Sequence, residues 1–316
     1  MTKKEEEKMV EDLIIESLIE LCDLSCEYCR NEETEIKSKI IFPQKRKNRD
    51  EEKIKNRYCK KKKNNDCNRR VSEQEAKVLF IKNMQEPKYE GFLYSVETPT
   101  KRKYSFSKNE TETESSKSGN IDICLHENNG ERKHLIEFKA NNTGSYFPDF
   151  VKLLYDNERI LTNYFVHVLE NSKKGTIKSV VNKYNNAIYE CKEWKEDKDN
   201  QSKIKVFLCI MAKKSIRKYE VDIDDVDQKN DVKNDDNEKI RKKINSNITV
   251  VLTPENQLKN ALADINDLKE VTKLTVKGTS ADPDSDSDYI RENLSNSLEL
   301  DMSDAFPDLR LMRKYR

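Results

Sequence analysis

Apolar positions along the middle of the chain alternate between two spacings, one typical of helices and one typical of strands. Apolar side chains three or four positions apart predict amphipathic helices over residues 9–21, 71–84, 148–155 and 176–194. Short apolar runs bounded by turn residues predict strands over residues 91–96, 103–107, 121–125, 135–140, 163–170 and 205–212. This order of elements predicts an α/β (α+β) fold with a mixed central β-sheet flanked by helices.

The apolar pattern is confined to part of the chain, which divides the sequence into four regions. Residues 1–70 are predicted to be a helical and basic N-terminal region that contains cysteines, and residues 71–215 to be the folded core. Residues 216–247 are predicted to be a charged linker because they lack an apolar period. Residues 248–316 are predicted to be a small or partly disordered C-terminal region.

An acidic stretch in the C-terminal region, Asp282 to Asp288, begins like a calcium-binding loop, with aspartates at its first, third and fifth positions. Ser287 stands at the sixth position, where the loop needs glycine, and Asn293 stands at the twelfth, where it needs a bidentate glutamate. The stretch is therefore predicted to be a solvated acidic loop.

Composition narrows the class of protein. Of the 316 residues, 34% are hydrophobic and 38% are charged, so one ordered core with charged, flexible N- and C-terminal extensions is expected. The sequence shows neither a secretory signal pattern nor an apolar run of transmembrane length, which predicts a cytoplasmic protein without a membrane partner. In that compartment the eight cysteines are expected to be thiols. A homodimer is compatible with the sequence.

A basic segment lies between residues 44 and 70, which contain thirteen Lys or Arg residues but only four Asp or Glu residues. Such a density of positive charge favours contacts with nucleic-acid phosphates through the release of counterions. A flexible solvated arm is the alternative, and the two interpretations are compatible. The residues predicted to bind nucleic acid are Lys60, Lys61, Lys62, Lys63, Arg69 and Arg70.

Cysteines near the N-terminus offer two metal-binding hypotheses. Cys22, Cys26 and Cys29 have a C-x3-C-x2-C spacing that resembles the cluster-binding motif of radical S-adenosylmethionine enzymes. A helix precedes the motif here, however, and the chain lacks the run of strands and helices that such a barrel needs. A structural zinc site on Cys26, Cys29, Cys59 and Cys67 is a second hypothesis, weakened by the loose spacing of the last pair. Thiols that only pack are the favoured interpretation.

Charged residues interrupt two apolar strands around the turn signal Asn-Asn-Gly at 128–130, which predicts a β-hairpin. Asp122 lies in the first strand, and Glu137 and Lys139 lie on one face of the second. Two carboxylates and an ammonium group on a half-buried sheet are costly without a partner. A divalent cation would be such a partner.

Asp122, followed fifteen positions later by Glu137-Phe138-Lys139, resembles the core motif of the PD-(D/E)xK, or restriction-endonuclease-like, nucleases. The resemblance extends over about residues 71–212, because the order helix, strands, hairpin, helix, strand, helix, strand matches that superfamily. Ile121 replaces the proline that often precedes the aspartate. Glu-x-Lys recurs along this charged chain by chance, and only the apolar strand context distinguishes Glu137.

The resemblance implies a Mg²⁺- or Mn²⁺-dependent endonuclease that hydrolyses phosphodiester bonds, with DNA favoured over RNA and with a restriction or defence role. Asp122, Glu137 and the backbone carbonyl of Phe138 would be metal ligands. Lys139 would orient the attacking water or offset charge in the transition state. Glu75 corresponds to the acidic residue of the superfamily's first helix and would be a further catalytic and metal-binding residue.

Three alternatives remain open at this point. Asp122 and Lys139 would form an ordinary cross-strand ion pair, with Glu137 solvated, if the hairpin only had to pack. The same fold would also serve as a non-catalytic nucleic-acid-binding module. Glu75 forms a capping-box pattern with Ser72, which gives it a structural role of its own.

Overall fold

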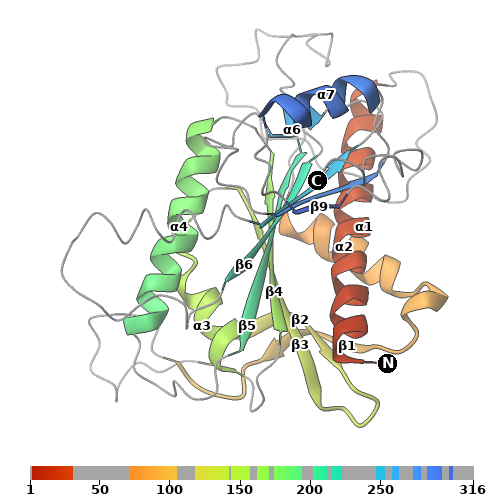
Figure 1. The fold of residues 1–316 in the computed structure, drawn as a ribbon. Coiled ribbons are helices and arrows are strands. Elements are labelled where there is room, and N and C mark those ends of the chain that lie inside the picture. The colour runs from red at the N-terminus through yellow and green to blue at the C-terminus, as the bar shows by residue number, and fades with distance from the viewer. Residues whose placement is uncertain are drawn as a thin grey trace, which may run out of the picture.

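Among the residues that it describes, the computed structural model contains two β-sheets and the helices that cover them (Figure 1). It describes residues 2–30, 72–104, 118–141, 144–156, 162–170, 174–193, 202–211, 215–221, 247–252, 258–262, 273–278, 283–293 and 299–301.

The larger sheet has six strands, and their order in space follows their order in the chain. Neighbouring strands are antiparallel from β1 to β3, parallel from β3 to β5, and antiparallel again between β5 and β6. The strands are β1 (Leu93–Pro99), β2 (Asn120–His126), β3 (Arg132–Ala140), β4 (Thr162–Leu169), β5 (Lys203–Ile210) and β6 (Ser215–Val221). This mixed sheet with helices on its faces is an α/β arrangement, as the sequence predicts.

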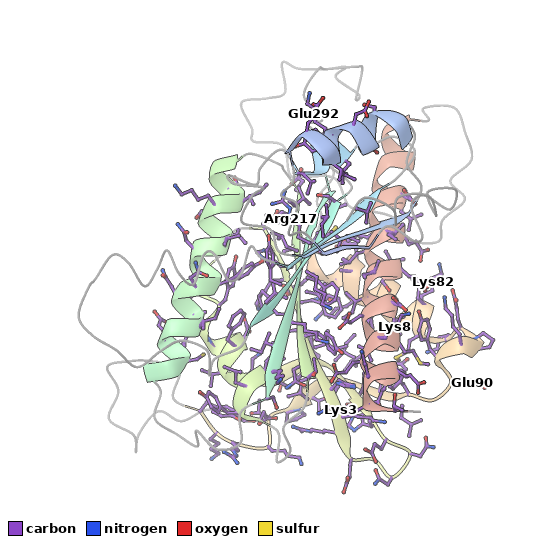
Figure 2. All side chains as sticks on the ribbon, in the orientation of Figure 1. Lys3, Lys8, Lys82, Glu90, Arg217 and Glu292 are labelled. Carbon is purple, nitrogen blue, oxygen red and sulfur yellow. The ribbon has the colours of Figure 1, made fainter. Side chains whose placement is uncertain are left out.

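Two helices cover each face of this sheet (Figure 1). On one face lie α1 (Lys3–Arg30) and α2 (Glu73–Met84), which is followed by a short 3₁₀ turn at Pro87–Tyr89. The other face carries α3 (Phe147–Tyr155) and α4 (Lys174–Glu193). Side chains fill the space between the sheet and the helices, while the labelled Lys82 and Glu90 lie on the outside (Figure 2). The sheet therefore separates two apolar cores.

Helix α1 is an integral part of the first core, although the sequence pattern places it in a separate region before residue 70. Leu13 and Leu18 are fully buried within that core. Ion pairs add to the apolar contact, since Lys205 Nζ lies 3.0 Å from Glu7 and 2.6 Å from Glu11. The apolar stripe of α1 and these flanking pairs together fix the helix across the sheet.

The structure corrects two predictions for the chain beyond residue 215, while residues 222–246 of the predicted linker lie outside the described residues. The predicted linker begins instead with β6, whose Ile216 and Tyr219 are buried and which completes the sheet beside β5. The predicted acidic loop at 282–288 lies largely within a helix, α7 (Pro283–Asn293). Asp286 of this helix is buried, and its Oδ1 accepts a hydrogen bond of 2.9 Å from the Leu258 N–H. Strand pairing with β5 and the hydrogen bond between Asp286 and the Leu258 N–H thus give these charged segments a regular structure that their local sequence does not predict.

The smaller sheet is parallel and follows a regular spacing along the chain. It comprises β7 (Asn247–Leu252), β8 (Lys273–Gly278) and β9 (Glu299–Asp301), with α6 (Leu258–Leu262) and α7 in the two connections. Asn247 pairs with Lys273, and Lys273 pairs with Glu299, so both offsets are 26 residues. β7 also contacts β6 of the larger sheet. Equal offsets and sequential order are typical of a β/α repeat.

Part of the sequence prediction lies outside the described residues. The predicted strand at 103–107 is described only as far as Tyr104, and the basic segment at 44–70 is not described. Within the described residues, no helix is both long and apolar enough to cross a membrane.

Candidate active site

The candidate site lies where β2 and β3 stop pairing with each other. Their antiparallel pairing extends from His126 and Arg132 to Ile123 and Ile136. Beyond this point a side chain replaces the backbone acceptor, because Asp122 Oδ2 accepts a hydrogen bond of 2.7 Å from the Phe138 N–H. The N–H and C=O of one strand residue point toward the same neighbouring strand. The Phe138 carbonyl therefore faces the same gap as the Asp122 carboxylate.

Asp122 is held from the other side by helix α2. Lys77 Nζ lies 3.0 Å from Asp122 Oδ1 and 3.1 Å from Glu97 Oε1 of β1. Glu97 lies across from Asp122, since the flanking residues of the two strands are paired. Like charges at directly opposite positions repel each other. The Lys77 ammonium group between them offsets that repulsion.

Glu137 is buried and bound to a lysine of helix α3. Its side chain is 2% exposed, and its Oε1 lies 2.5 Å from Lys152 Nζ. The same ammonium group lies 3.2 Å from Asp149 Oδ1 and donates a hydrogen bond of 2.9 Å to the Asn120 carbonyl. Burial raises the pKa of Glu137 well above its usual range, and the neighbouring Asp149 adds to this shift while Lys152 opposes it. A carboxylate in this position needs a cation.

Lys139 faces the same cluster from the next outward position of β3. Its Nζ lies 3.3 Å from Asp149 Oδ2. Burial by itself would lower the pKa of Lys139, but the carboxylates of Asp149, Glu137 and Glu73 raise it above the usual value. Lys139 is therefore charged at neutral pH. The predicted trio Asp122, Glu137 and Lys139 lies in one cluster, but the predicted alternative of an Asp122–Lys139 pair with a solvated Glu137 does not describe it.

The acidic residue that α2 contributes to this cluster is Glu73, whereas the sequence analysis assigned that role to Glu75. Glu75 caps its own helix, accepting a hydrogen bond of 2.9 Å from the Ser72 N–H and another from the Ser72 hydroxyl. Burial raises the pKa of Glu73, and the charges that act on it are Lys139, Asp122, Lys77 and Asp149.

The buried stripe of α2 explains this correction. Ala76, Phe80 and Asn83 are buried, whereas Val78 is 49% exposed, so the buried face of α2 does not include Val78. Glu73 and Lys77 are four residues apart and share the side that faces the strands. The capping box on Glu75 was the signal that could have pointed to Glu73 instead.

Sequence reasoning also missed four charged residues of the cluster, namely Lys77, Glu97, Asp149 and Lys152. Asp149 and Lys152 carry a detectable signal, because both are buried within α3, whose other residues are almost all apolar. A charged residue in an apolar helix, like one in an apolar strand, is costly to bury without a partner and therefore points to a paired group. Lys77 and Glu97 carry no such signal, because charged residues also occur elsewhere in α2 and because most of β1 is exposed.

The chemistry of this cluster fits a divalent cation, although the ligands are not preassembled around one. Asp122, Glu137 and the Phe138 carbonyl offer the hard oxygen atoms that Mg²⁺ and Mn²⁺ prefer. Ammonium groups already bind both carboxylates, which shows that these oxygen atoms accept cations. Within the described residues, no group of three His, Cys, Asp or Glu side chains is arranged to hold a metal ion.

The other predicted metal-binding and nucleic-acid-binding residues contribute little to the described structure. Cys22, Cys26 and Cys29 all lie in the continuous helix α1, and Cys22 is buried with its Sγ 3.5 Å from Cys209 Sγ. A buried thiol in a helix packed on the sheet does not favour an iron–sulfur cluster. Cys59 and Cys67 of the zinc hypothesis lie outside the described residues. So do the predicted nucleic-acid-binding residues Lys60, Lys61, Lys62, Lys63, Arg69 and Arg70.

Comparisons with protein-family models, with curated proteins and with solved structures found no match for this chain.

Proposed function

We propose that the chain is a metal-dependent nuclease that hydrolyses phosphodiester bonds in nucleic acid, with DNA favoured over RNA. The observation that carries the proposal is the convergence of Asp122, Glu137 and Lys139 at the gap between β2 and β3. These three residues come from the D…ExK pattern of the PD-(D/E)xK nucleases. Glu73 from the preceding helix and the Phe138 carbonyl extend the set of oxygen atoms. A role in restriction or defence rests on the resemblance alone.

The chemistry of phosphodiester hydrolysis assigns a part to each group. A bound Mg²⁺ or Mn²⁺ would supply a water of lowered pKa and polarise the phosphate. Asp122, Glu137 and the Phe138 carbonyl would hold that ion, with Glu73 as a further acid of the site. Lys139, kept charged by its carboxylate neighbours, would hold the attacking water in place or offset negative charge on the phosphate.

Cleavage assays on purified protein test this proposal. Plasmid DNA, single-stranded DNA and RNA would each be incubated with the full chain in Mg²⁺, in Mn²⁺ and in EDTA. We expect metal-dependent cleavage, and a loss of about 100-fold or more in Glu137→Gln and Asp122→Asn, because each replaces a charged metal ligand by a neutral amide. Glu131→Gln is the matched control, since Glu131 is exposed in the hairpin loop. Cleavage that survives in both site variants would contradict the proposal.

A second candidate function is a nucleic-acid-binding module without catalysis. The observation in its favour is that lysines already bind Asp122 and Glu137. Wild-type protein that binds oligonucleotides but cleaves neither DNA nor RNA in either metal would establish this second function.

A further inference from the structure

The cation-binding oxygen atoms of the candidate site surround an ammonium group. Lys152 Nζ has three oxygen neighbours from three different elements, at 2.5 Å from Glu137 of β3, 3.2 Å from Asp149 of α3 and 2.9 Å from the Asn120 carbonyl of β2. The Lys152 side chain is only 10% exposed. This arrangement is an oxygen-lined cation site whose cation is a side chain of the protein.

The carboxylates of the cluster outnumber its ammonium groups even when Lys152 is counted. The cluster contains five carboxylates, of Glu73, Glu97, Asp122, Glu137 and Asp149, and three ammonium groups, of Lys77, Lys139 and Lys152. With every group ionised, five negative and three positive charges leave a net charge of −2. One divalent cation, or protons on the buried carboxylates, would neutralise it. The lysines therefore hold the cluster together without satisfying its charge.

We propose that the Lys152 ammonium group and a divalent cation compete for Glu137, so that the metal binds only when the head group of Lys152 moves away. This inference rests on the proposed function, because it concerns the metal site of that function. A lysine can make the move, since its charge lies at the end of a flexible four-carbon stem. Asp149 remains as a partner within reach of the displaced head group.

The competition has a consequence for the order of binding. The displaced ammonium group keeps only Asp149, which it shares with Lys139, so a further anion would stabilise it. A phosphate group of the substrate would be such an anion, and it would arrive beside the metal. Lys152 is therefore a positioning residue that keeps the affinity for metal low until a phosphate is present.

Metal binding without nucleic acid tests the competition directly. The full-length protein would be titrated with Mn²⁺ while the free ion is followed by electron paramagnetic resonance. Lys152→Met removes the competing charge, so we expect it to bind Mn²⁺ about tenfold more tightly than wild type. Lys88→Met is the matched control, because exposed Lys88 pairs with Glu16 at 2.7 Å and should leave the affinity unchanged. An affinity of Lys152→Met equal to or weaker than wild type would overturn the proposal.

A second variant guards against a folding defect, and the outcomes separate the two proposals. Lys152→Gln keeps a hydrogen-bond donor for Glu137 without the charge, and it should also bind Mn²⁺ more tightly than wild type. Thermal unfolding would verify the fold of each variant. If wild type cleaves nucleic acid but neither folded variant binds Mn²⁺ more tightly, the competition fails and the nuclease stands. If both bind more tightly and wild type does not cleave, the nuclease fails and the competition stands.

Discussion

Glu97 shows that the candidate site holds a residue in a costly conformation. Its φ of 48° lies in the left-handed region, which costs roughly 1–2 kcal/mol for a residue with a side chain. The conformation falls within strand β1, where extended backbone would be expected, and across from Asp122. The contact of 3.1 Å with Lys77 Nζ is the interaction that accompanies it. Strained residues tend to cluster at functional sites, so Glu97 belongs with the site rather than with the scaffold.

The burial of His167, which lies on β4 next to the cluster, leads to a prediction of how the stability of the protein depends on pH. Its Nε2 lies 2.7 Å from the Asn141 carbonyl, so Nε2 carries the proton and donates a hydrogen bond to that carbonyl. Nδ1 accepts a hydrogen bond of 2.5 Å from the Tyr184 hydroxyl. Burial lowers the pKa of His167 from 6.5 to about 4. Between these values the unfolded chain binds more protons than the folded protein. The contribution of His167 to stability is therefore complete above pH 6.5 and is lost as the pH falls toward 4.

Urea unfolding at pH 7 and pH 5 checks this prediction. The shift implies that the free energy of unfolding falls by about 2 kcal/mol more in wild type than in His167→Gln between pH 7 and pH 5, at about 1.4 kcal/mol for each pKa unit. The carboxylates titrate in both proteins and cancel in the comparison. Equal losses would mean that His167 is not held neutral by burial.

At the level of single residues, the sequence reveals a site when charge interrupts an apolar element. Asp122, Glu137 and Lys139 could be found in this way because their neighbours in the strands are apolar. Glu73 could not be distinguished from Glu75 on that basis. The capping box on Glu75 gives that residue another role, but the position of Glu73 depends on the rotation of α2, which is set by packing against α1 and the sheet.

At the level of elements, the docking of α1 leads to a test of the domain boundary. Leu13 is fully buried in the core between α1, α2 and the sheet. Leu13→Ala should lower the free energy of unfolding of the full chain by about 3 kcal/mol, because the lost methyl groups leave a cavity. Lys4→Ala is the control, since Lys4 is exposed on the same helix. Urea unfolding followed by circular dichroism would measure both. An unchanged main transition in Leu13→Ala would mean that α1 folds apart from the sheet.

The elements between residues 71 and 212 were largely predictable because each has its own apolar period. The predicted hairpin and the strand at 205–212 correspond to β2, β3 and β5. β6 was missed because its two buried apolar residues, Ile216 and Tyr219, are separated by two charged residues, and because its place depends on pairing with β5. The place of α1 was missed because its contacts are far away in sequence, as the pairs with Lys205 show. Local patterns find elements, whereas long-range contacts decide which of them share a core.

At the level of the whole molecule, the basic segment predicts how binding depends on salt. Replacing Lys60–Lys63 by Gln should weaken the binding of duplex DNA and reduce the slope of log affinity against log salt by about 3.6, since each of the four phosphate contacts contributes about 0.9. Fluorescence anisotropy over a range of salt concentrations would measure the slope. The matched control replaces four exposed lysines elsewhere, Lys4, Lys8, Lys178 and Lys259. Equal reductions in the two variants would show that net charge, and not this segment, drives binding.

The spacing of the smaller sheet makes a prediction about how the C-terminal region tolerates shortening. β8 pairs with β7, and β9 with β8, at the same offset of 26 residues. Deletion of residues 273–298 would therefore bring Glu299 to the position of Lys273 and Leu300 to that of the buried Leu274. In a repeat architecture each unit contacts mainly its neighbours, so removal of one whole unit preserves the remaining interfaces.

We expect this 26-residue deletion to retain a cooperative thermal transition and a protease-resistant β7. Deletion of 13 residues, 286–298, is the control. Both deletions remove Asp286 and its hydrogen bond with the Leu258 N–H, so this contact does not distinguish the two proteins. The shorter deletion differs because it keeps β8 and the first residues of α7, which together are only part of a unit. Thermal unfolding and limited proteolysis with mass spectrometry would compare the two proteins. If the longer deletion exposes β7 to protease as readily as the shorter one, the equal offsets do not reflect a repeat.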